Sequence, residues 1–102
     1  MYIIIKTTTN SKEIADKISN QILSKKLSPC INIYRNICSK YVWENNVKRV
    51  REYIIEIKTK RIFKNHIVEI IKTTHNYSTP EIISTNFNIL SNKYKKWFDK
   101  SL

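Results

Sequence analysis

The spacing of the apolar residues changes repeatedly along this chain, and the order of those changes limits the fold more than any other feature. Apolar and β-branched residues follow one another at residues 2–8, which predicts a strand. Asn10 and Glu13 then predict a capping box at the start of a helix. The apolar residues after them recur every fourth position, as is typical of a helix with one buried face: Ile14, Ile18 and Ile22.

Two segments in the middle of the chain predict one long hairpin. Residues 30–43 and 47–59 both alternate apolar and polar side chains, which is the period of a strand. Residues 44–46 between them suit a turn because asparagine tolerates a positive φ. The alternation is interrupted near Arg35 and Asn36, where we expect a bulge.

The remaining chain completes a familiar order of elements. Helical spacing returns at residues 61–76, residues 81–89 alternate again, and Ser91 can cap a last short helix. The order β-α-β-β-α-β predicts an α+β, ferredoxin-like sandwich: one antiparallel sheet with both helices on one face, plus the extra C-terminal helix. The other sheet face then needs a ligand, the terminal helix or another subunit to cover it.

The length and composition predict a single domain over residues 1–102. No apolar run approaches the roughly 20 residues that span a bilayer, and the first residues do not resemble a signal peptide, so we expect a cytoplasmic protein with no membrane partner. Cys30 and Cys38 would lie about 26 Å apart in one strand, so we expect two reduced thiols rather than a disulfide.

The net charge of +11 has two explanations. A basic surface attracts nucleic acids through counterion release. The chain also lacks glycine, is rich in Ile, Lys and Asn, and scatters its lysines along its length, as AT-rich codons would produce. Charge alone therefore does not predict a nucleic-acid partner.

Several short strings, in the same order and at compatible spacings, resemble the CutA divalent-cation tolerance family. The family segments are Ala-Ala-Cys-Val-Asn-Ile, Tyr-x-Trp-x-Gly, Ile-Lys-Thr, His-Pro-Tyr-Glu-x-Pro-Glu-Ile and Tyr-x-x-Trp. Their counterparts here are SPCINI at 28–33, YVWE at 41–44, IKT at 57–59, HNYSTPEI at 75–82 and YKKW at 94–97. The resemblance covers nearly the whole chain.

The resemblance implies a homotrimer of ferredoxin-like protomers, related in shape to PII-type signalling proteins, with no established enzymatic activity. It also implies a connection with divalent cations, copper especially. The chain departs from the family where Asn36 and Asn45 replace turn glycines. The cysteine that some relatives carry near the end of the first strand is absent, and their histidine pair is reduced to His75.

The resemblance and the donor chemistry give a candidate copper set. His75 is the obvious ligand, Glu81 lies in the same string, and Cys30 could join them if the second strand passes beneath that loop. We expect weak binding that is not required for folding. The alternative is that His75 ends the second helix and Cys30 belongs to the core.

A second set of residues suits a ligand pocket or a subunit interface. Aromatic side chains beside a cation would bind a small anionic or ring-bearing effector, and the same residue types are enriched between subunits. The candidates are Tyr41, Trp43, Lys58, Tyr77 and Trp97, with Glu81 nearby.

The sequence favours binding over catalysis. It has no nucleophile–base motif and, without glycine, no Gly-rich phosphate loop, so we predict that the protein is not an enzyme. The alternative function is an RRM-like RNA-binding domain, which shares the order of strands and helices. Residues 50–57 lack the aromatic pattern that such a domain needs on its third strand.

Overall fold

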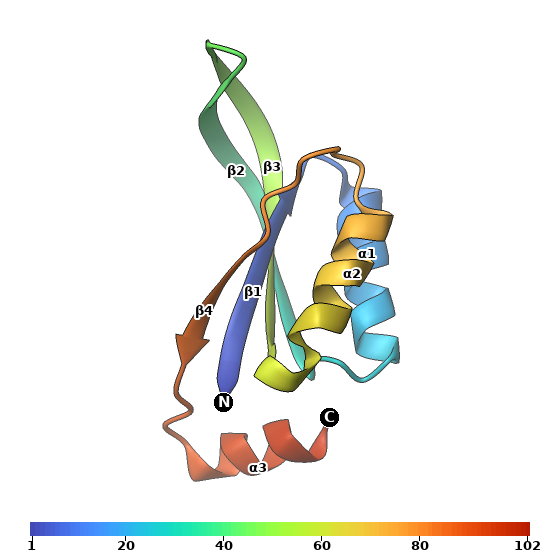
Figure 1. Ribbon diagram of the computed structural model, residues 1–102. Coiled ribbons are helices and arrows are strands. Elements are labelled where there is room, and N and C mark those ends of the chain that lie inside the picture. The colour runs from blue at the N-terminus through green and yellow to red at the C-terminus, as the bar shows by residue number, and fades with distance from the viewer.

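The computed structural model describes all residues, 1–102, and confirms the predicted ferredoxin-like plan (Figure 1). One antiparallel sheet has the strand order β2-β3-β1-β4. The elements follow one another as β1 (Tyr2–Thr9), α1 (Lys12–Ser24), β2 (Cys30–Trp43), β3 (Asn46–Lys60), a 3-10 turn (Arg61–Phe63), α2 (Lys64–Thr74), β4 (Ile83–Phe87) and α3 (Asn92–Lys100). None of the helices has the length and apolar character needed to cross a membrane.

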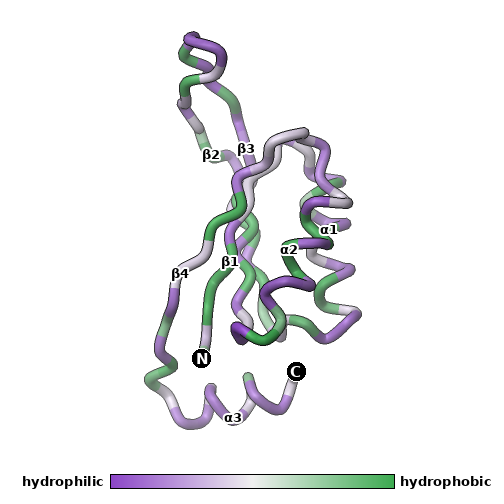
Figure 2. Tube along the Cα trace, in the orientation of Figure 1, coloured by the Kyte–Doolittle hydropathy of each residue, from purple (hydrophilic) through white to green (hydrophobic).

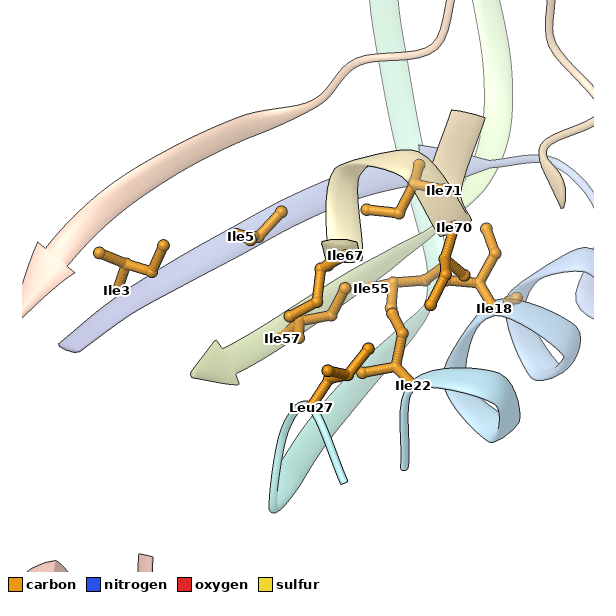
Figure 3. Packing of buried hydrophobic residues seen from close by; sticks show 11 residues of the cluster. Ile3, Ile5, Ile18, Ile22, Leu27, Ile55, Ile57, Ile67, Ile70 and Ile71 are labelled. Atoms are coloured by element: carbon orange, nitrogen blue, oxygen red, sulfur yellow. The ribbon is translucent and has the colours of Figure 1, made fainter. Parts of the chain in front are cut away.

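The core lies between one face of the sheet and the helices α1 and α2 (Figure 3). Alternate residues of β1 are buried, so Ile3 and Ile5 face the helices while their neighbours face the opposite side. Ile18 and Ile22 of α1 and Ile67 of α2 are fully buried against them. Each such side chain contributes about 1.5–3 kcal/mol when removed from water.

The start of α1 differs from the predicted cap. Ser11, not Asn10, has the extended backbone of a cap residue, and its hydroxyl accepts a hydrogen bond from the Ile14 N–H at 3.2 Å. A capping box needs a Glu or Gln three residues after the cap, a position that Ile14 occupies. The predicted capping box of Asn10 and Glu13 is therefore wrong. The Asn10 side chain instead accepts a hydrogen bond from Asn76 at 2.8 Å.

The long hairpin, its bulge and its turn are confirmed. The pairing of β2 with β3 shifts register between Tyr34 and Ile37, and Asn36 there has a φ of 61°. Glu44 and Asn45 have φ of 50° and 65°, as both central residues of a type I′ turn require. The distal half of the hairpin extends beyond the rest of the molecule and carries green apolar segments along it (Figure 2).

The last strand is shorter than the predicted segment of residues 81–89. In the pairing with β1, Phe87 lies opposite Tyr2 and Ile83 opposite Lys6. Since β1 itself begins at Tyr2, residues beyond Phe87 have no partner to extend the ladder.

The helix α3 covers part of the second sheet face. Ser91 caps it, as predicted, by accepting a hydrogen bond from the Tyr94 N–H at 3.2 Å. Its buried Phe98 packs edge-on against Tyr2, with ring centroids 5.4 Å apart. Tyr2 points away from Ile3, so α3 lies against the face opposite α1 and α2, at the end where β1 begins (Figure 1).

Candidate functional site

An open cavity of about 790 Å³ lies between the distal half of the hairpin and the segment that joins α2 to β4. The hairpin contributes Tyr41 and Trp43 from β2, and Lys48 and Glu52 from β3. The joining segment, residues 75–82, contributes side chains from Tyr77 to Glu81. The fold thus brings together four residues that the sequence marked, Tyr41, Trp43, Tyr77 and Glu81. Their role in binding a ligand stays a prediction.

The other two predicted pocket residues, Lys58 and Trp97, lie elsewhere. Lys58 is six residues from Glu52 along β3, about 20 Å at the rise of a strand. Its Nζ donates a hydrogen bond to Asn32 at 2.8 Å, and it lines a second, shallower cavity beside α3. Trp97 is on α3, where its ring packs against Tyr94 and Phe98. Within one chain these two residues therefore lie away from the cavity, and their role at a subunit interface stays a prediction.

Glu52 is the cavity residue that sequence reasoning missed. It is only 5% exposed. Tyr77 donates its phenolic hydrogen to Glu52 Oε2 at 2.7 Å, and burial together with this carboxylate raises the pKa of Tyr77. The available signal was a glutamate between Val50 and Ile54 on the same side of β3. That side also carries the charged residues Lys48 and Glu56, so the pattern did not distinguish a buried Glu52 from an exposed one.

His75 ends α2, as the alternative interpretation expected. Its backbone N–H donates to the Ile71 carbonyl at 3.0 Å, which caps the helix. Its ring joins two other segments: Nε2 lies 2.8 Å from the Thr8 carbonyl, and Nδ1 accepts from the Tyr77 N–H at 3.0 Å. A carbonyl requires a donor and an N–H requires an acceptor, so both contacts fit only the neutral ring with its hydrogen on Nε2. Burial lowers the pKa of His75, consistent with this form.

The predicted copper ligands do not converge within one chain. Thr8, which His75 contacts, pairs with Ile54, whereas Cys30 pairs with Lys58, four residues further along β3. Both ring nitrogens of His75 are already engaged. No group of three or more His, Cys, Asp or Glu side chains is close enough to hold a metal ion. The predicted set of His75, Glu81 and Cys30 is therefore not assembled within one chain, because the sheet register separates Cys30 from the segment that His75 contacts. A role of these residues in a site between chains stays a prediction.

The two cysteines are both free, as predicted. The Cys30 thiol is half-buried and lies 3.9 Å from the Lys58 amine. Cys38 is exposed on β2, and hydrogen bonding to Arg49 lowers the pKa of its thiol.

The fold and the cavity together define one class of protein: a ferredoxin-like α+β domain with a protruding hairpin and a ligand-sized open cavity beside the distal half of that hairpin. Comparison with protein-family models makes the class specific, because residues 3–101 match the family described as CutA1 divalent ion tolerance protein. The chain belongs to the CutA1 family. The resemblance seen in the sequence is thereby confirmed.

Individual relatives agree with this assignment. The chain is 32% identical to the chloroplastic protein CutA of Arabidopsis thaliana over 99 residues, which cover 97% of this chain and 54% of that protein. It is 28% identical to the divalent-cation tolerance protein CutA of Archaeoglobus fulgidus over 102 residues, covering 100% and 99% of the two chains. The chain spans between 54% and 61% of the length of the first three curated relatives it matches.

Solved structures show the same fold. The CutA1 structure from Ehrlichia chaffeensis has a TM-score of 0.89 and 35% identity, covering 98% of this chain and 94% of that one. The CutA structure from Archaeoglobus fulgidus has a TM-score of 0.92 and 29% identity, covering 99% and 98%.

These findings do not favour the alternative of an RNA-binding domain. Base stacking by such a domain needs exposed aromatic rings on its central strands. In this protein Tyr2 is the only aromatic residue of β1, and Phe87 and Phe98 pack against it.

Proposed function

We propose that this protein is a homotrimeric, non-catalytic divalent-cation tolerance protein that acts by binding a small ligand in the cavity between Trp43 and Tyr77, at a cleft between subunits. The observation that carries the proposal is the cavity itself. It gathers aromatic and charged side chains from the hairpin and from residues 75–82, whereas no metal centre is assembled in the chain.

Assembly is supported by the apolar surface of the distal hairpin. Val42 and Val47 lie opposite each other across the hairpin and are 71% and 76% exposed. Tyr34, Tyr41 and Trp43 on β2 are also exposed. β2 is an edge strand of 14 residues, which can pair with another chain. A second and third copy would cover this surface and this edge together.

Solution mass tests the assembly. We expect light scattering to give three times the 12.2 kDa of one chain. Introducing charge with Val42→Glu and Val47→Glu should shift the protein toward the monomer. The control, Ile62→Glu, changes a side chain that is equally exposed but lies beyond the hairpin, and it should keep the trimer. A wild-type monomer at micromolar concentration would contradict the proposal.

The non-catalytic role is supported by the chemistry of the cavity walls. The hydroxyl groups of Ser39, Ser78 and Thr79 line the cavity, and none of them is hydrogen bonded to a histidine or carboxylate that would activate it.

A divalent cation, copper in the first instance, would be cargo of this protein rather than a resident cofactor. Because the donors of one chain do not converge, we propose weak binding through donors of more than one subunit. Calorimetric titration with Cu²⁺ and Zn²⁺ tests this in the wild type, in His75→Ala and in the exposed control His66→Ala. We expect weak, similar binding in all three. A marked loss confined to His75→Ala would place His75 in the site.

We also propose a cytoplasmic location, in which both cysteines would stay reduced. Cell fractionation with an antibody to the native protein tests it, and recovery in an exported fraction would contradict it.

A further inference from the structure

We propose that the cavity recognises a small zwitterion, an amino acid with an apolar or aromatic side chain, whose ammonium binds Glu52 and whose carboxylate binds Lys48. The inference rests on the ligand-binding role proposed above and adds the chemical class of the ligand. It follows from the charges that the fold places around the cavity and from the absence of partners for those charges within one chain.

Glu52 is the group that would bind the ammonium of the ligand. Burying a carboxylate is costly unless hydrogen bonds or a positive charge compensate it. At 5% exposure, Glu52 receives a single hydrogen bond, from the neutral phenol of Tyr77 to Oε2. Its other oxygen accepts no hydrogen bond within the chain and is not fully buried, because Thr7 Oγ1 is the only fully buried side-chain polar atom that lacks a partner. That oxygen is therefore open to the cavity that Glu52 lines. An ammonium group in the cavity would supply both the missing donor and the missing positive charge.

The aromatic walls fit the same ligand. Tyr41, Trp43 and Tyr77 surround the cavity beside Glu52. Aromatic faces attract an ammonium group and also provide apolar surface for a ligand side chain. These rings suit a ligand that carries both an ammonium group and an apolar side chain.

Two lysines make a ligand that carries only an amine unfavourable. Lys40 and Lys48 line the cavity, and neither takes part in any ion pair or side-chain hydrogen bond of the protein. They would repel a ligand that is only positive. Glu52 and Glu81 would in turn repel a ligand that is only negative. A ligand with both charges can pair with the lysines and with the glutamates of the cavity.

The spacing of Glu52 and Lys48 also fits. Both are at even positions of β3, so their side chains leave the same face of the strand. Their Cα atoms are about 13 Å apart at the rise of a strand. Both side chains are long enough to lean toward each other, which leaves a gap suited to the adjacent ammonium and carboxylate of an amino acid.

Three probes that share one ring separate the charges: L-phenylalanine carries both, phenethylamine carries only the ammonium, and 3-phenylpropionate carries only the carboxylate. Binding to the assembled wild-type protein is measured by calorimetry and by the fluorescence of Trp43, with Trp97→Phe removing the second tryptophan signal. We expect L-phenylalanine to bind at least tenfold more tightly than either analogue. Equal affinities, or no binding by any probe, would overturn the inference.

Matched variants test whether Glu52 binds the ammonium of the ligand and Lys48 its carboxylate. Glu52→Gln keeps the shape and an acceptor for Tyr77, and should weaken L-phenylalanine and phenethylamine at least tenfold without affecting 3-phenylpropionate. Lys48→Met should weaken the two ligands that carry a carboxylate, L-phenylalanine and 3-phenylpropionate, at least tenfold without affecting phenethylamine. Glu56→Gln is the control, since Glu56 is on the same strand but pairs with Lys6 outside the cavity, at 3.6 Å. An unchanged L-phenylalanine affinity in Glu52→Gln would overturn the inference.

The outcomes also separate this inference from the proposed function. If 3-phenylpropionate alone bound, and Lys48→Met abolished it, the cavity would be a ligand site of another class: the inference would fail and the proposed function would stand. If light scattering showed a monomer, the proposed function would fail regardless of which probe bound.

Discussion

At the scale of single residues, His75 joins three parts of the molecule. Its backbone caps α2, Nε2 contacts the Thr8 carbonyl of β1, and Nδ1 accepts from the Tyr77 N–H. Through Tyr77 it also holds the side chain that donates to Glu52. The residue that most resembles a metal ligand in the sequence thus positions one wall of the cavity.

This arrangement predicts a pH dependence of stability. Because the pKa of His75 is lowered in the folded state, the unfolded chain binds the proton first as the pH falls below about 6.5, the ordinary histidine value. Stability from this residue is therefore complete above that pH and is lost progressively below it. We expect urea unfolding at one fixed protein concentration to show a lower free energy at pH 5.5 than at pH 7.5.

Substituting each histidine in turn tests whether His75 causes the pH dependence of stability. In His75→Gln the difference between the two pH values should shrink, whereas His66→Gln, on the exposed side of α2, should leave it unchanged. If His66→Gln removed the dependence and His75→Gln did not, the tautomer and the burial argued for His75 would be wrong.

The bond between Tyr77 and Glu52 predicts a cost for removing one hydroxyl. Tyr77→Phe leaves a buried carboxylate without its only hydrogen-bond donor, which costs about 1–3 kcal/mol. Chemical unfolding measures this loss. The control is Tyr53→Phe, because the Tyr53 ring packs against the core of the same chain and its hydroxyl makes no hydrogen bond there; this variant should change the free energy of unfolding by less than about 0.5 kcal/mol.

At the scale of elements, the turns of the hairpin form without glycine. Asn36, Glu44 and Asn45 all have positive φ. Asparagine adopts this conformation more readily than most residues because its short amide can hydrogen bond to the local backbone. The sequence therefore marked the bulge and the turn correctly.

The start of α1 gives a prediction for one element. Ser11→Ala removes the hydroxyl that accepts from the Ile14 N–H and should lower the free energy of unfolding by about 1 kcal/mol. Asn10→Ala removes only an exposed side-chain bond to Asn76 and should cost less. Denaturant unfolding of both variants checks the order, and a larger cost for Asn10→Ala would contradict the cap seen in the structure.

At the scale of the whole molecule, the chain is elongated, with principal extents of 46 × 25 × 22 Å. Its hydrophobic core contains 11 residues, all on the side of the sheet that α1 and α2 cover. The distal half of the hairpin lies outside that core and buries almost nothing within one chain. In the proposed trimer, the neighbouring subunits would bury this part and stabilise it.

That dependence predicts a concentration effect. If the hairpin is stabilised by association, the midpoint of thermal unfolding should rise with protein concentration, because assembly draws the equilibrium toward folded chains. Calorimetry over a hundredfold concentration range measures the shift. The charged hairpin variant, Val42→Glu with Val47→Glu, should unfold at a lower temperature with little concentration dependence. A midpoint that stays constant in the wild type would argue against the trimer.

The sequence by itself determined the order of the elements, the face that each presents to the core, and the family. Those properties depend on local periodicity and on short strings, which a single chain displays directly. The sequence also marked four cavity residues, since aromatic and charged side chains cluster in those strings.

Only the tertiary structure decided which candidates meet. The register of β2, β3 and β1 places Cys30 and Lys58 at one end of the sheet and His75 and Glu52 at the other. The reach of Tyr77 over the sheet buries Glu52, which its neighbours in the strand made look exposed. Distances between strands depend on pairing that is far apart in the sequence, so no local pattern could have supplied them.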